Sequence, residues 1–387
     1  MNKEKVSKSV ICTIIIILAV FRAGFAQSEE ETGQGLHKAE IGGYGEMVYY
    51  HPTAGVPESQ KTGTLDFRRF VLETGYRFSD DISFHSELEV EHTRVEPGEN
   101  SGEISVEEAY INFRLHPALN IRTGIMLVPV GLTNLENEPV DYPGVNRPPV
   151  ERYIIPSTWR EAGAGLFGEL NEKISYQIAF MAGLDPSGLS GALGIREARQ
   201  EGFKSSMQNI SLAGRLDYHL TKNGLAGVSA FYSGLANKKT DGQALNGAAL
   251  GLYEAHLQWK TDLFQLKGLA VYSHITQSDK INRYYGKQVG SEQYGLYALG
   301  AVNVLKWFAQ KEKPEAELWV FGRISQLNTQ AAATDFPVDK SNQLTELTLG
   351  LNYNPVEHVV IKADYEWMHR PLQNTIQQVN IGLGFDF

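Results

Sequence analysis

The stretch 129-PVGLTNLENEPVDYPGVNRPPVERYIIPSTWR-160 contains six of the fifteen prolines in this 387-residue chain. It shows neither the period of two expected for a strand nor the period of 3.6 expected for a helix. Proline donates no backbone hydrogen bond, so the stretch is not a central strand. Structureless loops of this length are uncommon in compact domains and are usually functional or disordered. Because apolar residues such as Tyr142, Ile154 and Trp159 are mixed with charged ones, we expect an ordered loop packed inside a larger structure.

Segments of alternating polar and apolar residues flank this loop on both sides. The clearest is the last, where Val379, Ile381, Leu383, Phe385 and Phe387 occupy every second position. Sixteen such segments lie near residues 38–50, 64–78, 82–95, 103–115, 119–128, 161–170, 173–184, 208–220, 224–236, 247–260, 263–274, 291–303, 315–327, 342–353, 357–370 and 375–387.

The connections between these segments are alternately long and short. Two connections break the rule, because 304–314 is too long for its end and 371–374 is too short. An even strand count with long loops at one end and tight turns at the other is the plan of an outer-membrane barrel. We therefore predict an all-β fold over residues 38–387. It is a sixteen-stranded antiparallel transmembrane β-barrel with 129–160 as an inward-folded constriction loop.

The orientation of each strand follows from the cost of placing charge in lipid. In the third segment His85, Glu87 and Glu89 share one face, and Leu88 and Val90 lie on the other. Carboxylates in hydrocarbon are costly, so the charged face should meet water. A barrel of this strand number is too wide for side chains to fill, which leaves an aqueous channel. The predicted pore-lining residues are Arg69, Glu73, Arg77, Glu87, Glu89, Glu91, Glu108, Arg114 and Arg122.

The N-terminus predicts export. Three lysines precede an apolar run over residues 10–21 and a small-residue cleavage site at Ala26, which indicates a signal peptide over 1–26. Residues 27–37 read as a short acidic leader. The single cysteine, Cys12, lies in the signal, so the exported chain has no disulfide and no cysteine-based site. After residue 26 there are 31 basic and 44 acidic residues, a net charge of −13, which argues against nucleic acid as a partner.

The region around the loop resembles the phosphate-selective porin O and P family of bacterial outer membranes. The resemblance rests on EAYINF at 108–113, on GIMLVPVG at 124–131, which leads into the loop, and on EAG at 161–163. The aromatic Phe387 at the end of the last strand resembles the assembly signal of outer-membrane barrels. Membership would imply a sixteen-stranded barrel, a homotrimer and passive diffusion of small, often anionic solutes. In that family, phosphate selectivity rests on a series of basic residues along the lumen. The predicted lumen of this chain has more acidic than basic residues, which weakens the expectation of phosphate selectivity.

Charged residues within the loop predict a pore constriction. They are Glu136, Glu138, Asp141, Arg147, Glu151, Arg152 and Arg160. Opposed charges there would set a transverse field that filters solutes by charge and dipole. The alternative is that these ions pair with one another and with the wall, and only hold the loop. Our specific hypothesis is that Arg147 and Arg152 line the narrowest point.

Three other motifs are set aside. The sequence 163-GAGLFG-168 matches a dinucleotide-binding pattern, but it follows a proline-rich loop and precedes a strand-like segment rather than a helix. His85 with Glu87, Glu89 and Glu91 forms a row on one strand, which lacks convergence from a second element and reads as a solvated acidic wall. No spacing picks out a Ser/His/Asp set. We predict no catalytic, cofactor or metal site.

The sequence therefore predicts a porin of the bacterial outer membrane that passes small hydrophilic solutes or ions by passive diffusion. Its partners would be outer-membrane lipid, these solutes and, by resemblance alone, two further copies in a homotrimer. A substrate-specific anion channel of the phosphate type, with the loop arginines as its binding site, stays open. So does a non-conducting structural or adhesive barrel. The rival fold is a soluble exported β-sandwich.

Overall fold

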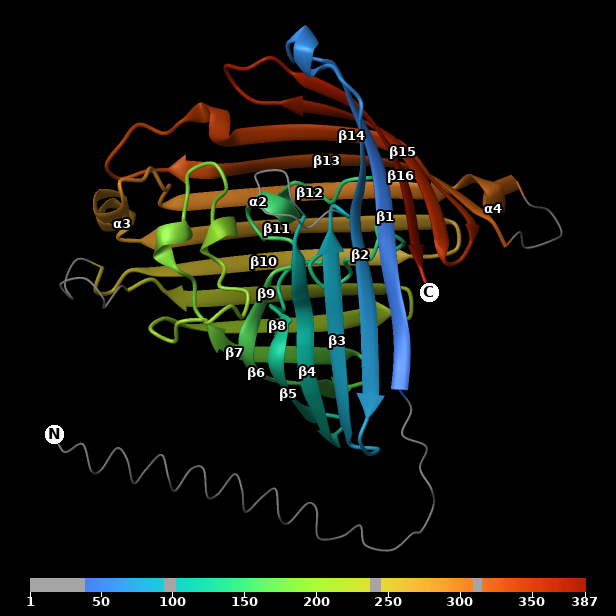
Figure 1. Ribbon diagram of the computed structural model, residues 1–387, viewed down its shortest axis with the longest axis horizontal. Helices are drawn as coiled ribbons and strands as arrows, with labels where there is room; N and C mark the ends of the chain where they lie inside the picture. The colour runs from blue at the N-terminus through green and yellow to red at the C-terminus, as the bar shows by residue number, and fades with distance from the viewer. Residues whose placement is uncertain (1–38, 94–101, 237–244, 309–314) are drawn as a thin grey trace, which may run out of the picture. The chain divides into compact units, whose positions relative to one another are not determined.

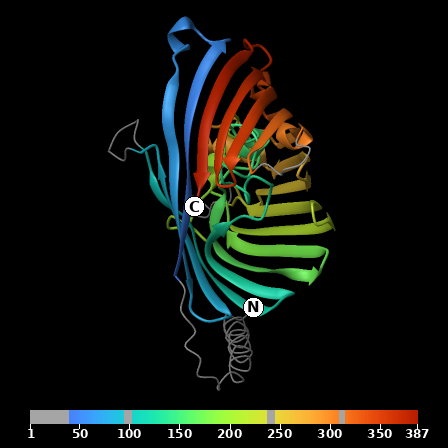
Figure 2. The ribbon, with the colours of Figure 1, turned by 90° about the vertical axis from the view of Figure 1, so that its right-hand side faces the viewer.

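The computed structural model describes residues 39–93, 102–236, 245–308 and 315–387. The strands among these residues form one closed sheet. The predicted signal peptide and leader lie outside the described residues. Each of the sixteen strands pairs antiparallel with its neighbour in the chain, and the last pairs with the first (Figures 1 and 2). The predicted sixteen-stranded antiparallel barrel is therefore confirmed.

All sixteen predicted segments correspond to strands. The largest differences are at β1, β3 and β13. β1 and β13 continue to Ala54 and Ala332, past their predicted ends, and β3 ends at Glu91, before its predicted end. The strands are β1 (Ala39–Ala54), β2 (Thr64–Arg77), β3 (Ile82–Glu91), β4 (Ile104–His116), β5 (Leu119–Leu127), β6 (Arg160–Asn171), β7 (Ile174–Ala182), β8 (Ile210–Thr221), β9 (Gly224–Gly234), β10 (Ala249–Lys260), β11 (Phe264–Thr276), β12 (Glu292–Asn303), β13 (Glu317–Ala332), β14 (Gln343–Val356), β15 (Val359–His369) and β16 (Ile376–Asp386). The 163–168 motif lies within strand β6.

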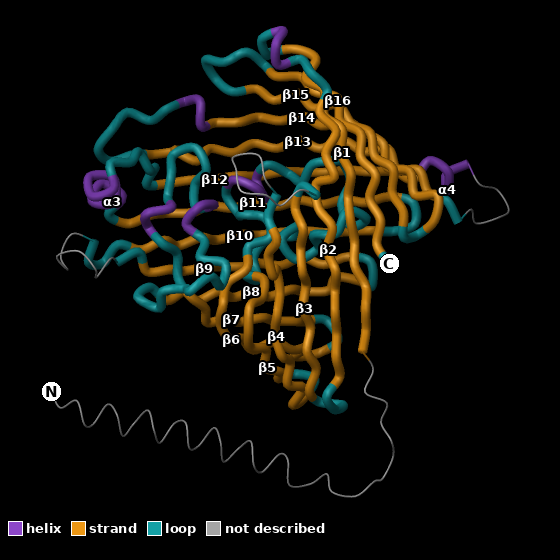
Figure 3. Tube along the Cα trace, in the orientation of Figure 1, coloured by secondary structure: helices purple, strands orange, loops and turns teal. Residues whose placement is uncertain are grey.

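Short helices occur only between strands in the described part of the chain. They are η1 (Glu58–Gln60), α2 (Val150–Tyr153), η2 (Pro186–Gly188), η3 (Arg196–Ala198), α3 (Ser278–Tyr285), α4 (Val304–Phe308) and η4 (Lys340–Asn342). Figure 3 shows α3 among the long connections at one end of the barrel and α4 at the opposite end. Helix α4 accounts for part of the unusually long 304–314 connection. Within the described residues, no helix has the length and hydropathy required to cross a membrane.

Strand β16 closes the barrel against β1. Their register runs from Tyr44 opposite Asp386 to Ala54 opposite Gln377. It is extended by Gly43 and Phe387, whose backbone groups exchange hydrogen bonds of 3.1 and 2.9 Å. Closure leaves no open sheet edge, which is a requirement for a sheet that spans lipid.

The two faces of the wall differ in polarity, as the alternation predicts. In β14, Leu347, Leu349 and Leu351 are 40%, 47% and 44% exposed on the outer face. At the alternate positions, Glu346 and Thr348 are 5% and 0% exposed on the inner face. The outer face is therefore an apolar surface suited to lipid, and the ionisable groups point into the lumen.

Two β-bulges change this alternation. Glu46 pairs with Arg69 and Met47 with Phe67, so Arg68 is an extra residue in β2. In the same way Glu107 is extra in β4, because the register shifts between β3 and β4 at this point. A bulge redirects the side chains around it. As a result, neighbouring charged residues are turned inward together in both strands.

The loop between β5 and β6 fills part of the lumen. Its apolar side chains Leu132, Ile154 and Trp159 are buried with Phe231 of β9 in one hydrophobic cluster. The rings of Trp159 and Phe231 lie 4.4 Å apart at 58°. Burial of one such side chain contributes about 1.5–3 kcal/mol. Figure 2 shows the teal and green loop segments between the walls of the barrel, as predicted for an inward-folded loop.

Candidate functional site

The candidate site is the loop 129–160 together with the lumen wall around it. Wall side chains bind the loop backbone from several directions. From β8, Arg215 donates through Nη1 to the carbonyl oxygen of Gly131. From β2, Arg69 donates to the carbonyl oxygen of Asn137 at 2.6 Å, and Tyr44 Oη donates to Asn137 Oδ1 at 2.8 Å. A proline-rich loop has few backbone bonds of its own, so the wall supplies them.

The wall formed by β13 to β16 binds the middle of the loop. Lys362 Nζ donates to the carbonyl oxygens of Tyr142 and Gly144 at 2.9 and 2.8 Å, and lies 3.9 Å from the Tyr142 ring centre. Asp364 accepts from the backbone N–H of Val145 at 2.6 Å. Arg323, 1% exposed, donates to the carbonyl oxygen of Asn146 at 2.8 Å. These charges hold the loop and are covered by it.

Glu151 in α2 is a buried acceptor rather than an exposed one. It is 0% exposed. Its Oε1 accepts from the backbone N–H groups of Leu132 and Thr133 at 2.6 and 2.7 Å, and its Oε2 from Tyr297 Oη at 2.7 Å. Burial raises the pKa of Glu151, and these three donors oppose that shift. The carboxylate thus joins the start of the loop, α2 and β12.

Arg160 is also buried, at the point where the loop ends and β6 begins. Its Nη1 lies 3.1 Å from Oε1 of Glu107, the bulge residue of β4, and its Nη2 lies 3.2 Å from Ser105 Oγ. Both side chains of the ion pair are less than a tenth exposed. Neither Glu151 nor Arg160 therefore presents a charge to an open lumen.

Arg147 and Arg152 line the same cavity at the long-loop end. Arg147 donates to the carbonyl oxygen of Asn137 at 3.1 Å and to Thr158 Oγ1 at 3.2 Å. Arg152 is exposed and lies 5.6 Å from the ring centre of Tyr153. Arg370, just after β15, lies 6.0 Å from the same ring. All three arginines line a cavity of about 590 Å³.

The acidic loop residues Glu136, Glu138 and Asp141 have different charged neighbours. Glu136 pairs with Lys267 of β11 at 3.0 Å. Burial, then Asp141 and Glu73, raise the pKa of Glu138 to about 7. Burial and the neighbouring Glu136 raise the pKa of Asp141. At neutral pH, Glu138 is therefore divided between its charged and neutral forms.

Three predicted lining residues form a row of carboxylates across adjacent strands. Glu73 of β2 is opposite Glu87 of β3, which is opposite Glu108 of β4. His85 Nε2 lies 3.2 Å from Glu87 Oε1 and 3.8 Å from Glu108 Oε2. Glu89 is 5% exposed, and Glu91, at the end of β3, is exposed.

The predicted basic lining residues differ in their burial and in the groups that they contact. Arg69 is buried against Glu46 at 2.9 Å, so it belongs to the loop anchor. Arg122 donates to Asn112 Oδ1 at 2.9 Å and lies 4.0 Å from the Tyr110 ring centre. Arg77 is half exposed and lies 3.7 Å from Glu40. Arg114 lines a second cavity, of about 550 Å³, at the short-turn end with Asp81, His116 and Glu169.

A buried charge network on β8 to β10 was not foreseen. His256 lies 2.9 Å from Glu254 through Nδ1 and 2.8 Å from Asp217 through Nε2. Ser229 Oγ donates to Glu254 rather than to the histidine. The hydroxyl therefore has no imidazole base beside it, and this set lacks the geometry of a nucleophilic triad.

Other contributors were missed for identifiable reasons. Lys267 occupies a regular inward position of β11, so the alternation could have found it. Arg323 shares its face with Trp319 and Phe321, which made its side ambiguous in the sequence. All three are buried inward. Arg370 follows the end of β15, where no periodic signal exists.

Comparison with known proteins agrees with this geometry. A family model described as phosphate-selective porin O and P matches residues 49–147, from β1 into the loop. A protein of Aquifex aeolicus (strain VF5), itself described as uncharacterized, is 31% identical over 355 residues, which cover 89% of this chain and 78% of that protein. The chain belongs to the phosphate-selective porin O and P family. The resemblance seen in the sequence is thereby confirmed.

Solved structures similar to this porin share its fold at low identity. OprB of Pseudomonas putida gives a TM-score of 0.59 at 10% identity, covering 90% of this chain and 94% of OprB. The anion-selective porin from Comamonas acidovorans gives 0.57 at 11%, covering 90% and 99%. OmpT of Vibrio cholerae in its trimer form gives 0.55 at 9%, covering 90% and 99%. At these identities the likeness concerns the fold alone.

Family and fold together establish the class of function. This porin is a passive channel of the bacterial outer membrane, as predicted. Its family and its fold are those of a channel rather than of an enzyme.

Proposed function

We propose that this porin is a general diffusion channel for small hydrophilic solutes and ions, with an arginine-lined region facing an acidic one. The observation that supports this most directly is that charged groups of both signs lie on the inner side of the barrel. Arg147, Arg152 and Arg370 line the cavity at the long-loop end, together with Glu346 and Glu366. The carboxylate row of Glu73, Glu87 and Glu108 lies on the inner face of β2 to β4.

Charges that are bonded to the loop act differently from charges that are not. Lys362 and Asp364 are bonded to backbone groups of the loop. Arg152, which is exposed, and the carboxylate row, in which Glu87 and Glu108 are 9% and 6% exposed, would set a field across the pore that acts on a passing solute. Because both signs are present, we expect selection by charge distribution and size rather than by one dedicated substrate.

The test is single-channel current across a planar bilayer with a potassium chloride gradient. We expect steady conductance, and a shift of the reversal potential towards cation preference in the double variant Arg147→Ala/Arg152→Ala. Arg283→Ala is the matched control, because Arg283 lies on α3, is largely exposed and pairs with Asp279. Unchanged conductance and ion preference in the double variant would reject the role of these arginines. A silent wild-type protein would favour the closed barrel.

A specific anion channel is the second candidate. Three arginines around one cavity could hold an anion of the phosphate type, since guanidinium groups bind such oxygens in a bidentate manner. Phosphate added to the same bilayer distinguishes the two candidates. Concentration-dependent block that disappears in the double variant supports the specific channel, and current that is indifferent to phosphate supports the general one.

We further propose that the porin assembles as a homotrimer and performs no catalysis. The trimer form of OmpT, which shares the fold, supports the first point, and family membership supports the second. Native mass spectrometry of the protein in detergent should give a mass near three times that of the exported chain. A monomer at every protein concentration would contradict the proposal.

A further inference from the structure

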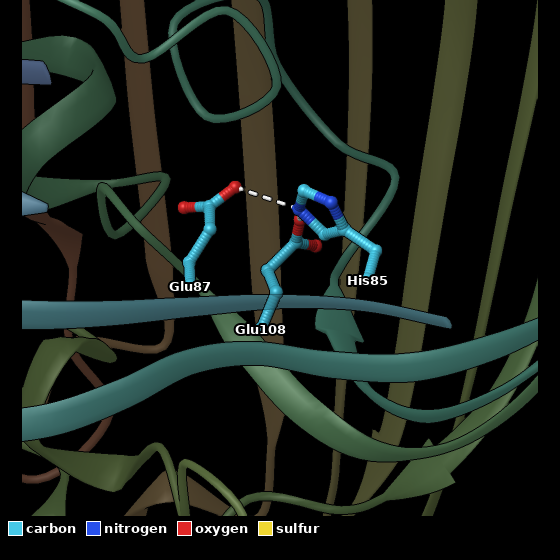
Figure 4. Close-up of side chains that lie close together, drawn as sticks. All are labelled: His85, Glu87 and Glu108. Carbon is cyan, nitrogen blue, oxygen red and sulfur yellow. Dashed lines mark hydrogen bonds and ion pairs between the residues drawn. The ribbon is translucent and has the colours of Figure 1, made fainter. Parts of the chain in front are cut away.

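Three metal-ligating side chains converge on the inner wall at β3 and β4. His85 and Glu87 project from β3, and Glu108 projects from β4 beside them (Figure 4). One ligand atom from each lies within 4.8 Å of the other two. From the sequence, a single row of ligands on one strand predicts no metal site, because a second element is lacking. The structure supplies that element in Glu108.

The separations between these atoms suit a common metal ion. His85 Nε2 is 3.2 Å from Glu87 Oε1 and 3.8 Å from Glu108 Oε2. Tetrahedral ligands with bonds of about 2.0–2.2 Å lie roughly 3.3–3.6 Å apart. A small shift of side chains would therefore place all three around one ion, with water completing the coordination. One nitrogen and two oxygens suit Zn²⁺, Mn²⁺ and related divalent ions.

The charge of the surrounding wall gives an independent reason for a cation. Register places Glu73 opposite Glu87 and Glu87 opposite Glu108, so three like charges are side by side. Like charges directly opposite in a sheet are destabilising. His85 contacts both Glu87 and Glu108, but a single N–H cannot point at both. A divalent ion would neutralise two carboxylates at once.

Contacts hold the ligands in place, and a cavity gives access to His85. Glu108 Oε1 accepts from the backbone N–H of Leu127 at 3.0 Å, which fixes the carboxylate. The His85 ring lies 5.1 Å from the Tyr110 ring. A cavity of about 180 Å³ is lined by both rings and gives access to His85. Outer contacts of this kind orient the ligands of metal sites.

We propose that His85, Glu87 and Glu108 bind one divalent transition-metal ion, of the Zn²⁺ or Mn²⁺ type, on the acidic wall of the lumen. The ion would lie where it also reduces the negative charge met by a passing solute. The test of this site is independent of the proposed ion selectivity, because metal binding is measured on the protein in detergent and requires no measurement of current.

The test is calorimetric titration of the folded, chelator-treated protein with Zn²⁺, together with Co²⁺ absorption to report nitrogen ligation. We expect saturable binding with one ion per chain. His85→Gln and Glu87→Gln should each weaken it at least about tenfold, an effect that even outer-shell partners of metal ligands can have. Each variant keeps a polar side chain of similar size, and heat-modifiable gel migration checks that it is folded.

Two controls separate this site from others that hold a histidine or a carboxylate. His358→Gln removes an exposed histidine that pairs with Asp386, and Glu172→Gln removes an exposed carboxylate in the turn after β6. Both should bind Zn²⁺ as the wild type does. Absence of saturable binding, equal affinity in the ligand variants, or an equal loss in the controls would overturn the proposal while leaving the channel function untouched.

Discussion

Two parts of the inner wall both carry several ionisable side chains, but these side chains differ in what they contact. On β13 to β16, Arg323, Lys362 and Asp364 are buried against the loop, and each bonds to a loop backbone group. On β2 to β4, Glu73, Glu87 and Glu108 stand in a row and repel one another. The charges of the first wall hold the loop. On the second wall Arg68 and Arg69 also bind the loop, whereas the carboxylate row is left to interact with a passing solute or a bound ion.

This difference has a physical basis in the partners of the charges rather than in burial, because Glu87 and Glu108, at 9% and 6% exposed, are about as buried as Asp364 at 6%. A buried charge is tolerated only where partners replace its water, and the loop carbonyl and N–H groups do so. A row of like charges needs water or a cation instead. Changes on the first wall should therefore alter stability, and changes on the second should alter selectivity.

The largest expected effect is on the wall that holds the loop. Lys362→Met removes the donor to the carbonyl oxygens of Tyr142 and Gly144 and leaves both without this partner. We expect a loss of about 3 kcal/mol in the free energy of unfolding, because each buried acceptor left without its donor costs about 1–3 kcal/mol. Guanidinium unfolding in detergent micelles measures it. Lys222→Met, in an exposed turn, is the control and should be close to wild type.

If Lys362→Met has the same free energy of unfolding as the wild type, the bonds from Lys362 to the loop contribute little to stability. The contrast between the two walls is then contradicted at the residue where the largest effect is expected. A larger and noisier single-channel current in the variant would show that the loop has been released. That second readout separates loop release from a general loss of stability.

A smaller effect is expected at β12. Tyr297→Phe removes the hydroxyl that donates to Glu151 Oε2 and leaves this buried carboxylate oxygen unpaired. Hydrogen bonds to charged groups contribute about 1.5–3 kcal/mol, so we expect a loss within that range. The same unfolding measurement tests it. Tyr253→Phe, on the outer face at 61% exposed, should change the unfolding free energy far less, and similar losses in both would contradict the role of Glu151.

These contacts also show what the sequence could and could not predict. Alternation identified all sixteen strands, and the prolines identified the loop, because both signals are local. The two bulges leave no such signal, so the inward turn of Arg68 and Glu107 was missed. The pairing of Lys362 with Tyr142 joins residues that are 220 positions apart, and no local pattern encodes it.

The candidate site was predicted less well than the fold for a related reason. Glu151 and Arg152 are consecutive in α2, yet the first is fully buried and the second is exposed. In a short, irregular helix the neighbours across the lumen decide which side chain faces water. Charge alone could therefore mark the loop as important without separating the residues that hold it from those that face the pore.

The last prediction concerns the acidic side, where selectivity rather than stability should respond. Glu138 faces Asp141 of its own loop, Glu73 and Glu87 of the wall and Asp386 of β16, and burial with these charges raises its pKa to about 7. Its ordinary pKa is lower, so protonation begins at a higher pH than for a free glutamate, and the carboxylate is charged at pH 8 and mostly neutral at pH 6. Cation preference should therefore fall modestly as the pH drops through 7.

Reversal potentials at several pH values, with a chelator present to exclude bound metal, measure this effect. Glu138→Gln should abolish the step near pH 7 and leave the porin at its low-pH preference throughout. Glu172→Gln, in an exposed turn, should keep the step. A step that persists in Glu138→Gln would assign the titration to another group and place the functional charge of the acidic side on the wall rather than on the loop.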